Sequence, residues 1–161
     1  MSTISEEPLF AEDAAQEPVS KIHKYLIFVI NDTDGSQLKL GIDAGYVVEI
    51  LNNYTLTYLP KMPHYVRGIF NMRGQIIPVM DIRMRLDKPV GEKSLLVVLN
   101  YNGTELGIVV DTVDRMVDID TDAITTVRAQ DAQRFVSGMC TIPDQSGTML
   151  VLNCDQLFAH E

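Results

Sequence analysis

The stretch that decides the fold is residues 67–86, RGIFNMRGQIIPVMDIRMRL. Within it, glycines border two runs of β-branched and aromatic residues, which is the pattern of short strands. We therefore predict strands at 68–72 and 75–80, joined by a tight turn at Arg73-Gly74. Gly74 supplies the positive φ that such a turn requires.

Two residues near the end of this stretch carry further local information. Asp81 is placed to cap a short helical turn, because a short carboxylate accepts hydrogen bonds from the first backbone N–H groups of a helix. Pro78 lacks a backbone donor, so we expect its strand to lie at a sheet edge or to be bulged there.

The polar residues of the turn allow two interpretations. Asn71 and Arg73 are either the solvated tip of a hairpin or a surface that faces a partner. Glu49, the only charge in residues 46–51 (YVVEIL), allows a similar choice. Its carboxylate points to water by the alternation of a strand, or it leans inward and pairs with Arg73. In the second case, Asn71 would be left to bond outward.

The other apolar runs predict an all-β chain with five strands in each of two halves. The additional strands are expected at 25–30, 38–42, 46–51, 95–99, 106–110, 116–119, 135–142 and 148–154. Each half ends with a glycine, a hairpin, an aspartate and a short helix, the second helix beginning at Asp155. This repeated order predicts two small β-barrel-like units in one body, with halves at about 21–90 and 94–158. The polar connection 120–134 begins with Asp120 or Thr121 as a cap.

Composition sets limits on location and partners. The chain has 161 residues and a net charge of −9, with five acidic and no basic residues in 1–20. We read residues 1–20 as a disordered acidic tail and 21–161 as one domain. No apolar run approaches the roughly 20 residues of a membrane span, and no signal peptide is visible. Cys140 and Cys154 are expected to be buried, reduced residues of a cytoplasmic protein, although a disulfide is possible if their strands pair.

The charge is unevenly distributed. Residues 61–93 hold seven basic and three acidic residues, whereas residues 94–161 hold three basic and ten acidic residues. Nucleic acid is a poor partner for this pattern, since it requires a coherent basic face with stacking aromatic residues. Complementary patches of this kind favour a protein partner.

The sequence offers no set of residues for catalysis or metal binding. His23, His64 and His160 are far apart, and none has a metal-ligand spacing with a cysteine. Asp118-x-Asp120-x-Asp122 begins like a calcium loop, but the required later glycine and glutamate are missing. No motif for a nucleophile or a phosphate loop appears. We therefore expect a binding protein without cofactor or metal.

Taken together, several motifs closely resemble the CheW family, the adaptor proteins of bacterial chemotaxis arrays. The resemblance runs from about residue 25 to 158. Its motifs are Val47-x-Glu49-Ile50, Pro60-x-x-Pro63, residues 68–81 (GIFNMRGQIIPVMD) and Leu106-Gly-Ile-Val-Val-Asp111-x-Val113. Met72 departs from the leucine usual in the motif, a change of similar volume.

The resemblance implies two intertwined, five-stranded SH3-like β-barrels with short helical turns. It also implies no enzymatic activity, and a scaffold that joins the cytoplasmic tips of chemoreceptors to the regulatory domain of the histidine kinase CheA. Its partner-binding residues match Val47, Glu49, Gly68, Asn71, Arg73 and Gly74. A receptor helix is expected in the groove between the barrels. An adaptor of a parallel chemosensory pathway and a small-molecule sensor are the alternatives.

Overall fold

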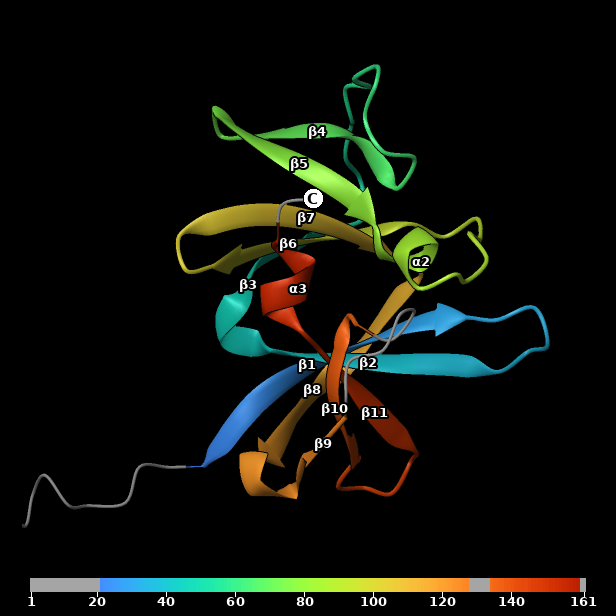
Figure 1. Ribbon diagram of the computed structural model, residues 1–161, viewed down its shortest axis with the longest axis vertical. Coiled ribbons are helices and arrows are strands. Elements are labelled where there is room, and N and C mark those ends of the chain that lie inside the picture. The colour runs from blue at the N-terminus through green and yellow to red at the C-terminus, as the bar shows by residue number, and fades with distance from the viewer. Residues whose placement is uncertain (1–20, 128–133, 160–161) are drawn as a thin grey trace, which may run out of the picture.

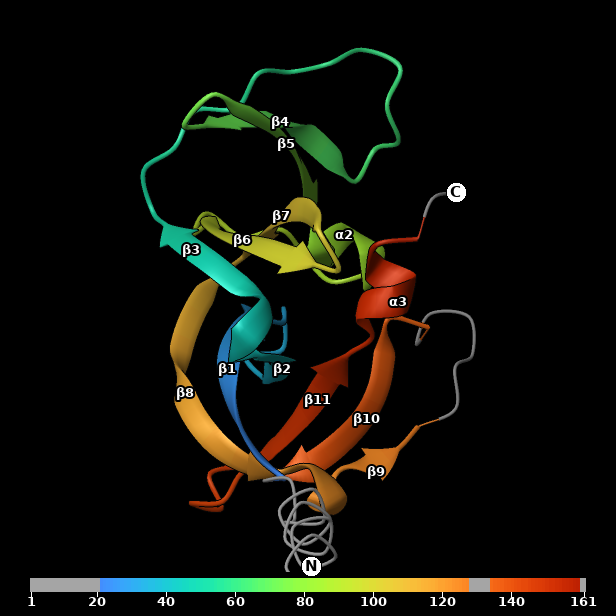
Figure 2. The same ribbon diagram turned by 90° about the vertical axis from the view of Figure 1, so that its left-hand side faces the viewer.

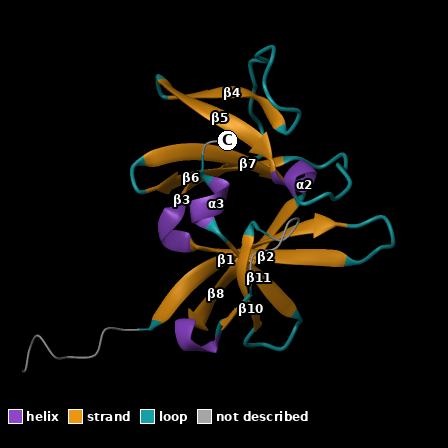
Figure 3. Cartoon of the chain, viewed as in Figure 1, coloured by secondary structure: helices purple, strands orange, loops and turns teal. Residues whose placement is uncertain are grey.

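The computed structural model describes residues 21–127 and 134–159, so the predicted acidic tail lies outside the described residues. The described chain is mostly strand, with short helical segments at strand ends (Figure 3). In chain order the elements are β1 (Ile22–Asn31), β2 (Gln37–Asp43), η1 (Ala44–Tyr46), β3 (Val47–Leu51), β4 (Val66–Met72), β5 (Gln75–Asp81), α2 (Ile82–Arg85), β6 (Leu95–Tyr101), β7 (Thr104–Val110), β8 (Thr112–Asp120), η2 (Thr121–Ala123), β9 (Thr125–Thr126), β10 (Val136–Thr141), β11 (Thr148–Leu152) and α3 (Cys154–Leu157).

These strands form two sheets that lie one above the other (Figure 1). One sheet has the order β8-β1-β2-β11-β10-β9, and the other has the order β3-β6-β7-β5-β4. Each sheet therefore takes strands from both halves of the sequence. The two halves meet in parallel pairs, β2 with β11 and β5 with β7. This confirms the expected all-β fold with two intertwined units.

Strong curvature wraps each sheet around its own apolar interior (Figure 2). The largest cluster of buried residues packs between the sheets and includes Phe28, Leu40 and Ile108. A second cluster, which includes Ile27 and Met149, belongs to the six-stranded sheet. A third, with Ile77 and Val98, belongs to the five-stranded sheet. The alternating side chains of β1 and β6 thus serve two cores at once, as expected for strands buried on both faces.

The position of β5 differs from the prediction made for Pro78. β5 is not an edge strand, because it lies between β4 and β7. Nor is it bulged at Pro78, because the irregularity of this hairpin lies on β4, between Val66 and Gly68. Pro78 is tolerated because the parallel ladder to β7 begins only at Val79. On the other side Pro78 faces Ile69, whose backbone N–H and C=O both bond to Thr57 instead. No ladder hydrogen bond is therefore needed from Pro78.

Other boundaries shift by a few residues. The six-stranded sheet contains an additional two-residue strand, β9, within the predicted connection 120–134. Of the two residues predicted as a helix cap, Asp120 and Thr121, Asp120 is the one that caps η2. The terminal helix is capped by Asn153 rather than begun by Asp155. Cys154 consequently opens α3 instead of ending a strand, and both it and Cys140 are buried free thiols. Burial raises the pKa of Cys154 to about 12.

Candidate functional site

The β4–β5 hairpin has the predicted tight turn. Arg73 and Gly74 both have positive φ, 53° and 88°, and Met72 pairs with Gln75 across them. The side-chain Oδ1 of Asn71 accepts a hydrogen bond of 2.9 Å from the backbone N–H of Gly74. The hypothesis that Asn71 bonds outward is therefore wrong for this oxygen, which holds the turn in shape.

The second contact at this tip joins Glu49 to Arg73. A register shift between Val47 and Glu49 places them on different faces of β3: Val47 packs against the inter-sheet core, and the half-buried Glu49 pairs with Val98, which belongs to the core of the five-stranded sheet. Its Oε1 lies 3.2 Å from Nη2 of Arg73, so the inward-leaning, paired alternative is the one observed. The ion pair connects the two edge strands of the five-stranded sheet through the hairpin tip. Because the Arg73 side chain is 77% exposed, the pair contributes at most about 1 kcal/mol to stability.

Gly68 has a structural reason to be glycine. Its φ is +144°, and a Cβ added there would lie 2.5 Å from the carbonyl oxygen of Thr57. The chain between β3 and β4 therefore runs close beside β4, held there by the antiparallel pair of backbone hydrogen bonds between Thr57 and Ile69. Gly68 is buried beside this segment, and its lack of a side chain allows the close approach of the two chains.

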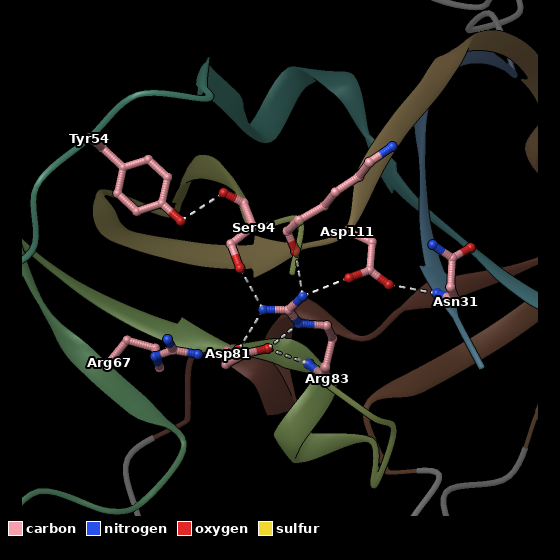
Figure 4. Close-up of polar contacts among 8 residues, drawn as sticks. Asn31, Tyr54, Arg67, Asp81, Arg83, Ser94 and Asp111 are labelled. Carbon is pink, nitrogen blue, oxygen red and sulfur yellow. Dashed lines mark hydrogen bonds and ion pairs between the residues drawn. The ribbon is translucent and has the colours of Figure 1, made fainter. Parts of the chain in front are cut away.

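Beneath the hairpin lies a buried ionic network (Figure 4). Arg83, with a fully buried side chain, donates from Nε and Nη2 to the two carboxylate oxygens of Asp81, each at 2.8 Å. Its Nη1 donates to Asp111 Oδ1 at 2.6 Å. The remaining donors are satisfied by the carbonyl of Lys93 and the hydroxyl of Ser94.

The network extends from the hairpin surface to the other sheet. At one end, Nη1 of Arg67 donates to Asp81 Oδ2 at 2.8 Å, and the Arg67 side chain is 39% exposed. At the other end, Asp111 Oδ2 accepts from the backbone N–H of Asn31 at 2.6 Å. Asp81 also caps α2, as predicted, by accepting from the N–H of Arg83. Hairpin, helix and both sheets are thus tied by one set of charged groups.

Two carboxylates hold the arginine in its charged form. Burial by itself lowers the pKa of Arg83, but the hydrogen bonds and charges of Asp81 and Asp111 outweigh burial and raise it. Sequence reasoning missed this network. Its only signal was the combination of Asp81 and Asp111, each directly after an apolar strand, with an arginine two residues beyond Asp81.

Several of the basic residues in 61–93 are paired with carboxylates of the same chain. Arg83 is buried and pairs with Asp81, and Arg67 pairs with the same Asp81 carboxylate. Arg73 pairs with Glu49, and Lys88 pairs with Asp32 at 2.9 Å. Much of the positive charge is therefore neutralised within the chain, so electrostatic steering by this segment is weaker than its sequence indicated.

Exposed apolar side chains mark two surfaces that sequence reasoning did not single out. Ile76 on β5 is 56% exposed and lies directly opposite Asn71 in the hairpin. On β3, Val48 and Ile50 are 44% and 38% exposed, on the face opposite Glu49. Large exposed apolar residues that border polar groups are typical of protein-binding surfaces.

The described residues offer no site for a metal. Among residues 21–127 and 134–159, no group of three or more His, Cys, Asp or Glu side chains could hold a metal ion. Within the same residues, no helix is both long and apolar enough to cross a membrane.

Comparison with known proteins identifies the family. The family model described as CheW-like domain matches residues 24–161. A chemotaxis protein CheW from Treponema pallidum is 28% identical over 133 residues, covering 74% of this chain and 75% of the relative. A chemotaxis protein CheW from Klebsiella aerogenes is 29% identical over 104 residues, covering 63% of this chain and only 60% of the relative.

The fold comparison agrees. The crystal structure of the scaffolding protein TtCheW from Thermoanaerobacter tengcongensis superposes with a TM-score of 0.68 at 26% identity. The match covers 81% of this chain and 89% of TtCheW. Family model, sequence relatives and fold lead to the same conclusion: the chain belongs to the CheW-like domain family.

Proposed function

We propose that this protein is a non-enzymatic adaptor of chemotaxis signalling, which couples chemoreceptors to the histidine kinase CheA in the cytoplasm. The observation that carries the proposal is the exposed β4–β5 hairpin tip, which the Asn71–Gly74 and Glu49–Arg73 contacts hold in one shape. A rigid exposed tip loses little conformational freedom on binding, which favours recognition. Membership of a family that includes a scaffolding protein supports this role.

The kinase face is the outer surface of the β4–β5 hairpin. Ile76 provides an apolar anchor, and the Asn71 side chain directly opposite and the Arg73 guanidinium provide a polar border. The regulatory domain of CheA covers this surface. Gly68 and Gly74 serve the same face by fixing the path of β4 and the turn.

The receptor face lies on the other edge of the same sheet, at β3. Val48 and Ile50 are exposed there, and Val47 forms part of the core beneath them. A hollow of about 310 Å³ lies beside the end of β3, lined by Asn52 and by the starts of β6 and β8 with the residues just before them, among them Leu95 and Val113. The tip of a receptor helix packs its apolar side chains against this edge.

Calorimetric titration with the purified regulatory domain of CheA tests the kinase face. Ile76→Glu places a charge in the centre of the proposed contact, and we expect the affinity to fall by at least about 30-fold, as for a hot-spot residue of about 2 kcal/mol. Arg73→Ala should weaken binding while the circular dichroism spectrum stays unchanged.

Met139→Glu is the matched control, because Met139 is an exposed strand residue of the other sheet. It should leave the affinity unchanged. Equal loss of affinity for Ile76→Glu and Met139→Glu, or saturable binding that neither change affects, would contradict the placement of the kinase face.

An adaptor of a parallel chemosensory pathway is the second candidate. It is equally consistent with membership of the CheW-like family, because the family model names no pathway. Titration against the regulatory domain of each CheA-type kinase of the host separates the two. The pathway is that of the kinase with the highest affinity.

A further inference from the structure

A pocket of about 370 Å³ lies on a part of the molecule that neither proposed face uses. Its walls come from the chain before β4, from β5 and β7, and from the end of α3, the helix drawn between the two sheets in Figure 1. Most of the surface is apolar, with Met62, Tyr65, Pro78, Leu106 and Phe158 among the lining residues. Its volume is within the range of small-molecule sites.

One polar atom in this wall lacks a partner. Glu105, half-buried on β7, lines the pocket, and its Oε1 is buried without a hydrogen bond to any described residue. Buried polar oxygen atoms are nearly always hydrogen-bonded, because an unpaired one keeps the cost of losing water. The pocket therefore combines an apolar surface with a single unsatisfied, acidic acceptor.

The nearby cation is engaged elsewhere. Arg85 also lines the pocket, but its guanidinium carbon lies 4.2 Å from the ring centres of both Tyr65 and Phe135. One of its nitrogens lies 3.8 Å from the sulfur of Met80. Arg85 is thus stacked into the wall and donates no hydrogen bond to Glu105 Oε1.

We propose that this pocket binds a small organic amine. The protonated amino group pairs with the carboxylate of Glu105, and the apolar body of the ligand packs against Leu106, Pro78 and Phe158. A neutral hydroxyl on a ligand of the same shape donates only a weaker, uncharged hydrogen bond, and an anionic ligand repels the carboxylate. The site therefore discriminates by charge as well as by shape. It goes beyond the adaptor role, since neither partner face includes it.

The test uses three ligands of similar shape: phenethylamine, 2-phenylethanol and 3-phenylpropionate. Each is titrated into ¹⁵N-labelled protein, and binding is followed by the amide shifts of Glu105, Leu106, Leu157 and Ala159. We expect phenethylamine to bind with a Kd on the order of 1 mM, as is usual for a ligand of this size. It should bind roughly tenfold more tightly than the alcohol, because the hydrogen bond of the ammonium group to the carboxylate joins two opposite charges, whereas that of the neutral hydroxyl does not.

Glu105→Gln keeps the shape of the side chain and removes its charge, so it should abolish the preference for the amine. Glu92→Gln, the same change at an exposed residue outside this pocket, should leave the preference intact. Equal affinity for amine and alcohol, an unchanged preference in the folded Glu105→Gln variant, or no saturable shift at these amides would each overturn the proposal. Kinase titrations are independent of this result.

Discussion

Replacement of Arg83 by Met tests whether the buried network stabilises the fold. The arginine side chain makes five hydrogen bonds, and its loss leaves Asp81 and Asp111 charged and buried, at 0% and 4% exposure. Met retains much of the apolar stem, so the change isolates the charge. Removal of one partner from a buried ion pair costs about 3–5 kcal/mol. That is a large share of the roughly 5–15 kcal/mol by which a domain is stable, and it lowers Tm by roughly 6–20 °C.

Urea unfolding measures this loss, followed by circular dichroism because the chain has no Trp. Arg73→Met is the matched control, since Arg73 also pairs with a carboxylate but its side chain is 77% exposed. It should cost less than about 1 kcal/mol. An Arg83→Met variant that unfolds at the same urea concentration as Arg73→Met, with an equal slope, would refute the reasoning.

Two further predictions concern two glycines of the β4–β5 hairpin and a tyrosine. Gly68→Ala should lower the free energy of unfolding by at least about 2 kcal/mol, because its Cβ would collide with the carbonyl of Thr57; Gly74→Ala, with no atom within 4 Å, should cost only about 1 kcal/mol in urea unfolding. The hydrogen bond to Asp155 raises the pKa of Tyr101 to about 12, above the ordinary value of 10.0. Its stabilising contribution is therefore complete below pH 10 and is lost as the pH rises through about 12. Asp155→Asn should move the phenol titration, followed by ultraviolet absorbance, back toward 10; an unmoved titration would exclude this bond as the cause.

The predictable part of the fold rests on local rules. The Arg73-Gly74 turn and the cap at Asp81 follow from residues within a few positions of one another. The sequential hairpins follow from alternating apolar runs and their turns. The exchange of strands between halves came only through the family resemblance, because parallel pairs such as β5 with β7 have no local signature.

The unpredicted part depends on distant contacts. Pro78 seemed to require an edge strand or a bulge because the bonds of Ile69 to Thr57, from a connecting segment, are invisible in the sequence. Arg83 looked like one member of a basic segment because its two acidic partners come from different halves, Asp81 at the end of β5 and Asp111 just after β7. The Glu49–Arg73 pair remained undecided, since it depends on how far the sheet curls to bring its edges together.

Folding and binding are separable at some hairpin positions and inseparable at others. Arg67 belongs to both, because its guanidinium is 39% exposed yet bonds to the buried Asp81. Charge reversal there places a carboxylate beside a buried carboxylate, so lost kinase binding would also follow from a distorted hairpin. A substitution at Gly68 likewise disturbs folding as well as binding, because an added side chain collides with the carbonyl of Thr57. Arg73 is exposed but also holds the tip through Glu49, whereas Ile76 is exposed and has no bond to the buried network, so a change at Ile76 assigns a loss of binding most directly to the surface itself.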